Sequence, residues 1–196
     1  MKDNFGVLMQ GHIKIHDPVT KEIIVDKRNA INYESMSLSL ANTLSNQGNG
    51  FISQMAFGNG GTFVDETGTI TYLTPNVSGL NAMLYNETYS KIVDSRSVNN
   101  TDPVRNNMTV RHTPGKNYSD VLVTCLLDYG EPQGQQAFDT ATTMNNEFTF
   151  DELGLVSFEP DSNGRLLSHV IFHPVQKSLN RLIQIDYTVR IQSLAG

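Results

Sequence analysis

A strict alternation of apolar and polar side chains near the C-terminus constrains the fold more than any other feature of the chain. Polar residues separate the apolar positions, which are Ile183, Ile185, Tyr187, Val189 and Ile191. Successive side chains of a β-strand point to opposite faces of its sheet, so this run predicts a long strand with one buried and one wet face. Such a strand needs a second layer to cover its apolar side.

Two further apolar runs precede this strand, and turn signals separate all three. The runs cover residues 148–158, 165–173 and 179–191, with EPDSNG at 159–164 and HP at 173–174 between them. Apolar runs joined by short turns predict a three-stranded antiparallel meander. We expect the earlier part of the chain to form the layer that covers this meander.

The first part of the chain carries an apolar arm, a hairpin signal and a helix signal. Residues 1–10 form an apolar arm, in which few polar side chains interrupt the apolar residues Phe5, Val7, Leu8 and Met9. In residues 11–26, apolar and polar side chains alternate on both sides of the turn sequence DPVTKE, as in a β-hairpin. Helical spacing follows, so we predict a helix at about 30–46 that Asn29 or Asn32 caps at its start. The apolar positions of this helix are Tyr33, Met36, Leu40, Ala41 and Leu44.

Short strand patterns fill most of the remaining chain. They lie at residues 51–57, 85–93, 107–113 and 121–127. We expect a long ordered loop at 62–82 with at most one short strand near 70–73, and a second loop at 129–146 with a helical turn near 135–139. About nine strands and one helix predict a mainly β protein, a jelly-roll-like two-sheet antiparallel β-sandwich that forms a single domain over residues 11–196.

Composition argues against several classes of function. The 196 residues carry a formal net charge of −6 and no basic run, whereas proteins that bind nucleic acids cluster Lys and Arg. The single cysteine, Cys125, permits no intrachain disulfide and no thiolate metal cluster, and we expect it to be a small buried residue. No apolar run reaches the ~20 residues of a membrane-spanning helix. We therefore expect neither nucleic acid nor a membrane as a partner.

Two histidine pairs and a glycine-rich run are the candidates for metal or phosphate binding. His12 and His16 are four residues apart, as are His169 and His173. On strands this spacing separates two side chains by roughly 13 Å, too far to share one ion. No lysine closely follows the run GNGG at 58–61, whereas phosphate-binding loops usually have one. A tight turn in which glycine adopts positive φ therefore explains this run better than a phosphate-binding loop does. We expect no metal and no cofactor.

A pair of neighbouring carboxylates raises the possibility of acid–base chemistry. Asp151 and Glu152 lie next to each other, and Asp161 follows. Glycoside hydrolysis needs two carboxyl groups roughly 5–9.5 Å apart across one sugar. Adjacent strand residues point to opposite faces, so this pair cannot cooperate unless a bulge, conceivable at Gly154, intervenes. We therefore expect a protein without enzymatic activity and assign no catalytic residue.

Five short segments share a pattern that spans about residues 11 to 192. They are GHIKI at 11–15, FGNGGT at 57–62, LYNETY at 84–89, FTFDELGL at 148–155 and HVIFHPVQKSLNR at 169–181. The pattern resembles a family of virion structural proteins of contractile-tailed bacteriophages. The motifs of this family are structural and carry no catalytic signature, so the resemblance implies a role in particle assembly.

We therefore expect a structural component of a tailed-bacteriophage virion, made in the host cytoplasm, that assembles as a ring or collar at the neck or tail. Its partners would be other virion structural proteins and further copies of itself. The apolar side chains of the arm, Phe5, Val7, Leu8 and Met9, are candidates for the interface, because burial of each would release roughly 1.5–3 kcal/mol. Alternatively, the arm folds back as the first strand of its own sandwich.

Two other functions are compatible with the sequence. One is a capsid decoration protein, and the other is a carbohydrate-binding module of a baseplate or tail fibre. A sugar site needs exposed aromatic side chains in a groove, and the chain has no tryptophan. The candidates for such a site are Tyr72, Tyr85, Tyr89 and Tyr118.

Overall fold

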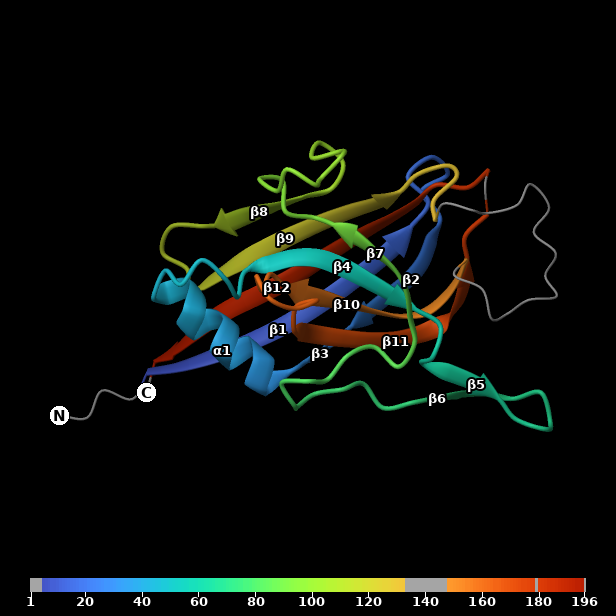
Figure 1. Ribbon diagram of the computed structural model, residues 1–196, viewed down its shortest axis with the longest axis horizontal. Coiled ribbons are helices and arrows are strands. Elements are labelled where there is room, and N and C mark those ends of the chain that lie inside the picture. Colours follow the sequence, from blue (N-terminus) through green and yellow to red (C-terminus); the bar gives the residue numbers. More distant parts are fainter. Residues whose placement is uncertain (1–4, 133–147, 179, 196) are drawn as a thin grey trace.

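Two five-stranded antiparallel sheets face each other in the computed structural model, which describes residues 5–132, 148–178 and 180–195 (Figure 1). The first sheet has the order β2 (Ile23–Arg28), β1 (Phe5–His16), β12 (Ile183–Ala195), β9 (Tyr118–Leu127), β8 (Asn107–His112). The second has the order β3 (Ala30–Ile31), β11 (Leu166–Gln176), β10 (Thr149–Ser157), β4 (Ile52–Gly58), β7 (Glu87–Ile92). This arrangement confirms the predicted mainly β sandwich with a helix after the first hairpin.

The strand β12 is the centre of the first sheet. It pairs with β1 from Phe5 to His16 on one side and with β9 from Tyr118 to Leu127 on the other. The predicted alternation is confirmed, because the inward side chains are at most 2% exposed at Ile183, Ile185, Tyr187 and Val189. These side chains join the inward residues of the second sheet in one hydrophobic core.

The predicted three-stranded meander is wrong. The strands β10 and β11 are neighbours in the second sheet, but β12 lies in the first, so the chain crosses from one sheet to the other after β11. The turn predicted at 173–174 is wrong too, since Pro174 lies inside β11. A register shift interrupts the β10–β11 ladder beside it, and proline is tolerated in strands at such irregularities.

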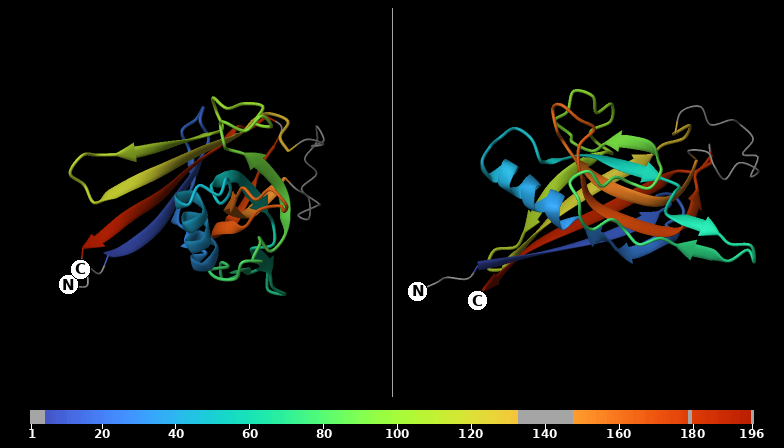
Figure 2. Two further views of the ribbon diagram at one scale, coloured as in Figure 1. Left: turned by 60° about the vertical axis from the view of Figure 1, so that its left-hand side comes forward. Right: turned by 60° about the horizontal axis from the view of Figure 1, so that its bottom comes forward.

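The predicted apolar arm is not separate from the sandwich. Residues 5–10 continue β1 and pair with β12, with Gln10 opposite Arg190 and Phe5 opposite Ala195. The structure therefore has no boundary between an arm and the sandwich after residue 10. Residues 5–10 instead belong to the first strand of the sandwich, as the alternative prediction had it. In Figure 2 the ends of β1 and β12 extend past the second sheet on the side of the helix.

The helix α1 (Tyr33–Leu44) is shorter than predicted, and its buried face differs. The Asn32 side chain caps it by accepting a hydrogen bond from Ser35 N at 3.1 Å. The expected apolar stripe does not face the core along its length, because Tyr33 is 70% and Leu44 86% exposed. Nor does any described helix combine the length and apolarity needed to cross a membrane. The buried side chains are Ser35, Met36 and Ser39.

The strand β10 and residues 166–172 of β11 are buried on both faces, because residues 59–86 run across the outer face of the second sheet. This segment contains two short paired strands, β5 (Thr62–Val64) and β6 (Ile70–Tyr72), where we expected at most one. A small apolar cluster lies beneath it, formed by Ala56, Leu84, Val156 and Leu166. Residues 133–147 of the second predicted loop, including the helical turn near 135–139, lie outside the described residues.

A buried polar network connects the two sheets. The hydroxyl of Tyr187 donates a hydrogen bond to Ser168 Oγ at 2.7 Å and accepts one from Asn29 Nδ2. Gly11 makes room for this network, since a Cβ atom there would lie 1.7 Å from Asn29 Oδ1. The network therefore explains why the first motif begins with glycine.

We expect Tyr187→Phe to lower the free energy of unfolding by roughly 1–3 kcal/mol, because it leaves buried hydrogen-bonding groups of Asn29 and Ser168 without their partner. Chemical denaturation measures the change. Tyr33→Phe is the matched control at an exposed tyrosine and should change stability little. Equal effects of the two substitutions would contradict this role of the network.

An ion-pair cluster lies on the outer face of the first sheet. Asp120 accepts hydrogen bonds from Arg190 Nε at 2.7 Å and from an Arg111 guanidinium nitrogen at 2.9 Å. These bonds, led by those of Arg190, lower the pKa of Asp120 from 3.8 to about 2 despite the opposing effect of burial. A carboxyl with a lowered pKa stabilises the fold above its unfolded pKa and loses this effect as pH falls through its folded value.

The stability of Asp120→Asn should therefore depend less on pH than that of the unchanged protein between pH about 4 and about 2. Urea unfolding across this range measures the dependence. Asp161→Asn, at an exposed aspartate, is the control and should retain the original slope. If Asp120→Asn left the slope unaltered, the ion-pair cluster would not be the cause.

Candidate functional site

Two adjacent carboxylates, Asp151 and Glu152, contact the same glycine-rich segment. Both are buried, with relative exposures of 3% and 0%. The β10–β11 ladder shifts register between Phe150 and Glu152, which forms a bulge at Asp151. At this bulge the side chain of Asp151 does not have to point to the face opposite that of Glu152. The expectation that the two carboxylates diverge is thus wrong, and the bulge lies at Asp151 instead of Gly154.

The carboxylate of Glu152 accepts four hydrogen bonds. Its donors lie on three segments that are distant in the sequence, and each bond is between 2.8 and 3.1 Å long. Burial raises the pKa of Glu152, but the hydrogen bonds, led by that of His169, more than offset this effect and lower it below its ordinary value. The charge is therefore stable inside the protein. The donors are the backbone N–H groups of Gly60, Tyr85 and Asn86 and the His169 ring.

His169 is held by both of its ring nitrogens. The backbone N–H of Asn76 donates to Nδ1 at 2.9 Å, so the proton of the neutral ring is on Nε2, which donates to Glu152 at 2.9 Å. Glu152 and His169 lie diagonally across the β10–β11 ladder, because Gly154 is opposite His169. This position on the outer face brings both side chains beneath residues 59–86.

Asp151 holds the next two residues of the glycine-rich segment. It accepts hydrogen bonds from Gly61 N and Thr62 N at 2.9 Å and from Thr62 Oγ1 at 2.5 Å. Burial raises its pKa above the ordinary value, and the hydrogen bonds offset this only in part. The two carboxylates together fix the backbone from residue 60 to residue 62, which is the start of β5.

The glycines of this segment are required by close packing. A Cβ atom at Gly58 would lie 2.5 Å from Glu152 Oε1, and one at Gly60 would lie 2.8 Å from Asn86 N. Neither residue has the positive φ that the sequence led us to expect. The glycines allow the backbone to approach the carboxylates, and the segment serves neither as a phosphate cradle nor as a left-handed turn.

Four of the five motif segments meet in this carboxylate cluster. They contribute its acceptors, its histidine and the backbone that covers them, while the fifth contributes Gly11 to the Tyr187 network. The side chains of Glu152 and His169 are fully buried, so no substrate can reach them in this structure. Among the described residues, no group of three or more His, Cys, Asp or Glu side chains is arranged to hold a metal ion.

The other histidines have separate surroundings. His12 pairs with Asp26 at 2.7 Å and His16 with Asp186 at 2.8 Å, both on the first sheet. His173 Nδ1 lies 3.2 Å from the hydroxyl of Tyr72. The two histidines of each pair therefore have separate partners and do not form a shared binding site. The remaining candidate, Cys125, is fully buried, which raises the pKa of its thiol to about 12.

Val7, Leu8 and Met9, three of the four candidate interface residues, border an apolar groove between α1 and the projecting part of the first sheet. The side chain of the fourth, Phe5, lies outside the described part of the structure. Val7 and Leu8 are 49% and 37% exposed, and Met9 is half-buried. Two adjoining hollows of about 470 and 310 Å³ meet here, and we call them together the end groove. Both hollows are lined by Met9, Met36 and Leu40.

The four candidate tyrosines do not share one groove. Tyr89 lies on β7 and Tyr118 on β9, which belong to different sheets, whereas Tyr72 and Tyr85 both belong to the segment 59–86. Tyr85 donates to Thr74 O at 2.6 Å, and the Arg190 guanidinium lies over Tyr118 at 4.0 Å from the ring centre. Because Tyr89 packs against the hydrophobic core and Tyr118 lies on the other sheet, the four tyrosines together do not form one surface for stacking a sugar.

Comparison of the chain with protein-family models, with curated proteins and with solved structures finds no match. The resemblance of its five motifs to phage virion proteins stays a prediction. The structure adds what four of those motifs do in this chain, which is to fix a surface segment onto the second sheet.

We expect Glu152→Ala to destabilise the fold by roughly 3–5 kcal/mol, because it leaves three backbone N–H groups and His169 buried without an acceptor. Denaturant unfolding measures the loss. Glu22→Ala, at a glutamate whose side chain is 66% exposed, is the matched control and should cost less than 1 kcal/mol. A similarly small loss for Glu152→Ala would show that the cluster does not hold the fold.

Proposed function

We propose that this protein is a non-enzymatic structural component of a tailed-bacteriophage virion, which assembles through protein–protein contacts as a ring or collar at the neck or tail. One observation carries the proposal. Within the motifs, the cluster of Asp151, Glu152 and His169 is buried in satisfied hydrogen bonds, whereas apolar side chains are exposed around the end groove. A protein of this kind offers partners a rigid surface for contact.

The exposed apolar residues support an assembly role. Val7, Tyr33 and Val110 border the two hollows and are 49%, 70% and 73% exposed. Contiguous apolar surface of this kind marks interaction sites in soluble proteins. Val7, Leu8 and Met9 therefore remain candidates for an interface, although they belong to a strand and not to a free arm.

The capsid decoration role uses the same surface properties, so it differs from the ring or collar only in location. The carbohydrate-binding role has less support, because the tyrosines proposed for it are dispersed. We propose other virion proteins and further copies of the chain as partners. The fully buried motif cluster gives neither a nucleic acid nor a small substrate a point of contact.

In purified particles of a phage that carries this protein, we expect mass spectrometry to detect it and cryo-electron microscopy to place several copies around the neck or tail axis. An epitope inserted in the β1–β2 turn, near Val19, marks the position and lies at the opposite end from α1 (Figure 1). Untagged particles are the control. A label on the capsid shell would favour decoration, and absence from the particle would overturn the proposal.

A further inference from the structure

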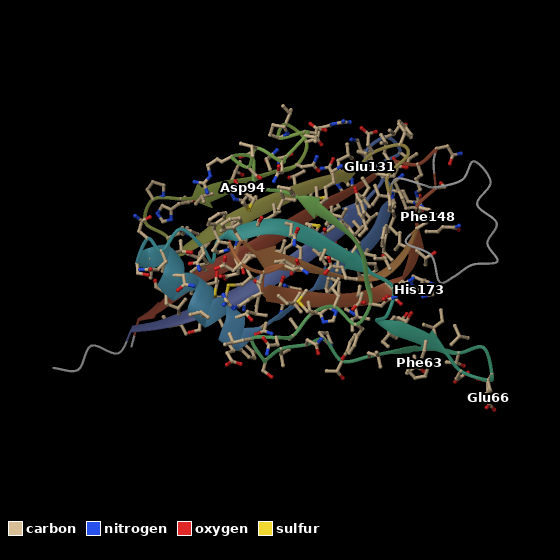
Figure 3. The ribbon with its side chains drawn as sticks, in the orientation of Figure 1. Phe63, Glu66, Asp94, Glu131, Phe148 and His173 are labelled. Carbon is tan, nitrogen blue, oxygen red and sulfur yellow. The ribbon has the colours of Figure 1, made fainter. Side chains whose placement is uncertain are left out.

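The β5–β6 hairpin presents apolar side chains to solvent. Phe63 and Val64 are each 51% exposed, and Tyr72 is 49% exposed. Figure 3 shows Phe63 and Glu66 on this hairpin at the edge of the molecule. Successive strand residues point to opposite faces, so Phe63 lies on one face of the hairpin and Val64 and Tyr72 lie on the other. Singly exposed apolar residues are ordinary, but these three make the projecting hairpin apolar on both faces, and we call it the apolar knob.

The knob is ordered at both of its ends. At its tip Asp65 accepts hydrogen bonds from Thr67 N at 2.8 Å and from Thr69 N at 2.9 Å, which closes the turn. At its base Asp151 holds Thr62, and Leu73 N donates to Gly61 O at 2.9 Å. A surface with this shape before binding loses little conformational entropy when it binds.

The end groove is a complementary surface at the other end of the molecule. Its larger hollow is lined mainly by apolar side chains, among them Leu40, Phe51, Met108, Val110 and Ile191. Arg96 lies at its mouth, with its guanidinium 5.8 Å from the centre of the Phe51 ring and its side chain 78% exposed. The groove thus combines an apolar floor with an exposed arginine at its rim, beside Asp94, which lines the same hollow but is largely buried.

We propose that this chain associates with copies of itself head to tail, with the β5–β6 hairpin of one copy inserted into the end groove of the next. Phe63 on one face of the hairpin, and Val64 and Tyr72 on the other, would contact opposite walls of the apolar groove. The acidic tip, where Glu66 follows Asp65, would face Arg96. Arg96 Nε lies 3.5 Å from the carboxylate of Asp94. The other N–H groups of the guanidinium can therefore bind a second acceptor.

The positions of the two surfaces determine the type of assembly. In Figure 1 and in the right panel of Figure 2, α1 and the β5–β6 hairpin lie at opposite ends of the long axis. A contact between two different surfaces repeats from copy to copy and forms a ring where the rotation closes, or a filament where it does not. The head-to-tail contact specifies how the proposed ring would form. It depends on the proposed function only for where in the virion the assembly lies.

Two variants test the contact. Phe63→Asp places a charge on the hairpin, and Val110→Asp places one in the groove at a side chain that is 73% exposed, so both should fold. Sedimentation of the purified chain over a concentration series should show oligomers for the unchanged protein. Each variant alone should associate at least tenfold more weakly. An equimolar mixture should form a one-to-one dimer that grows no further, because it retains one intact hairpin and one intact groove.

Val19→Asp, at an exposed valine in the β1–β2 turn, is the matched control and should associate like the unchanged protein. Circular dichroism verifies that each variant is folded. A monomeric unchanged chain, variants that still associate, or a mixture that does not pair would each overturn the head-to-tail contact. Any of these results would refute the contact but not the virion role, which the particle experiment tests separately. Conversely, absence of the protein from particles would refute the virion role but not the head-to-tail contact.

Discussion

The buried charge of Glu152 is the interaction on which the outer layer of the second sheet depends. A carboxylate taken out of water costs several kcal/mol unless donors replace its hydration. Here the donors are Gly60, Tyr85, Asn86 and His169, which come from three separate segments. Because charge-assisted hydrogen bonds are strong and an uncompensated charge is costly, these segments must fold onto β10 together. Four of the five motif segments meet at this carboxylate, and the fifth contributes Gly11 to the Tyr187 network.

The sequence predicted the strands better than it predicted their neighbours. Alternation identified β12 and its buried face, because both follow from the period of a strand. Which strand lies beside β12 depends on partners as distant as Phe5 and Leu127, so local pattern cannot decide it. The same limit applies to α1. The spacing of its apolar residues predicted a buried stripe, yet the helix buries Ser35, Met36 and Ser39 and leaves Leu44 exposed.

The candidate site shows where reasoning from residue types stops. The sequence directed attention to Asp151, Glu152, His169 and the glycine-rich run, and all of them proved to belong to one cluster. Their role was missed, because it depends on a register shift at Asp151 that no local signal revealed. The exposed β5–β6 hairpin was missed as well, since its two strands have only three residues each.

The cluster and the exposed surface are connected by the chain itself. Asp151 and Glu152 fix residues 60–62, and Thr62 begins the hairpin that presents Phe63 and Val64. A flexible hairpin would lose conformational entropy on binding, at roughly 1–2 kcal/mol for each backbone residue that becomes ordered. Burial of two or three apolar side chains releases an amount of similar size, so association of a flexible hairpin would gain little. Buried carboxylates that never contact a partner can thus decide whether the hairpin binds one.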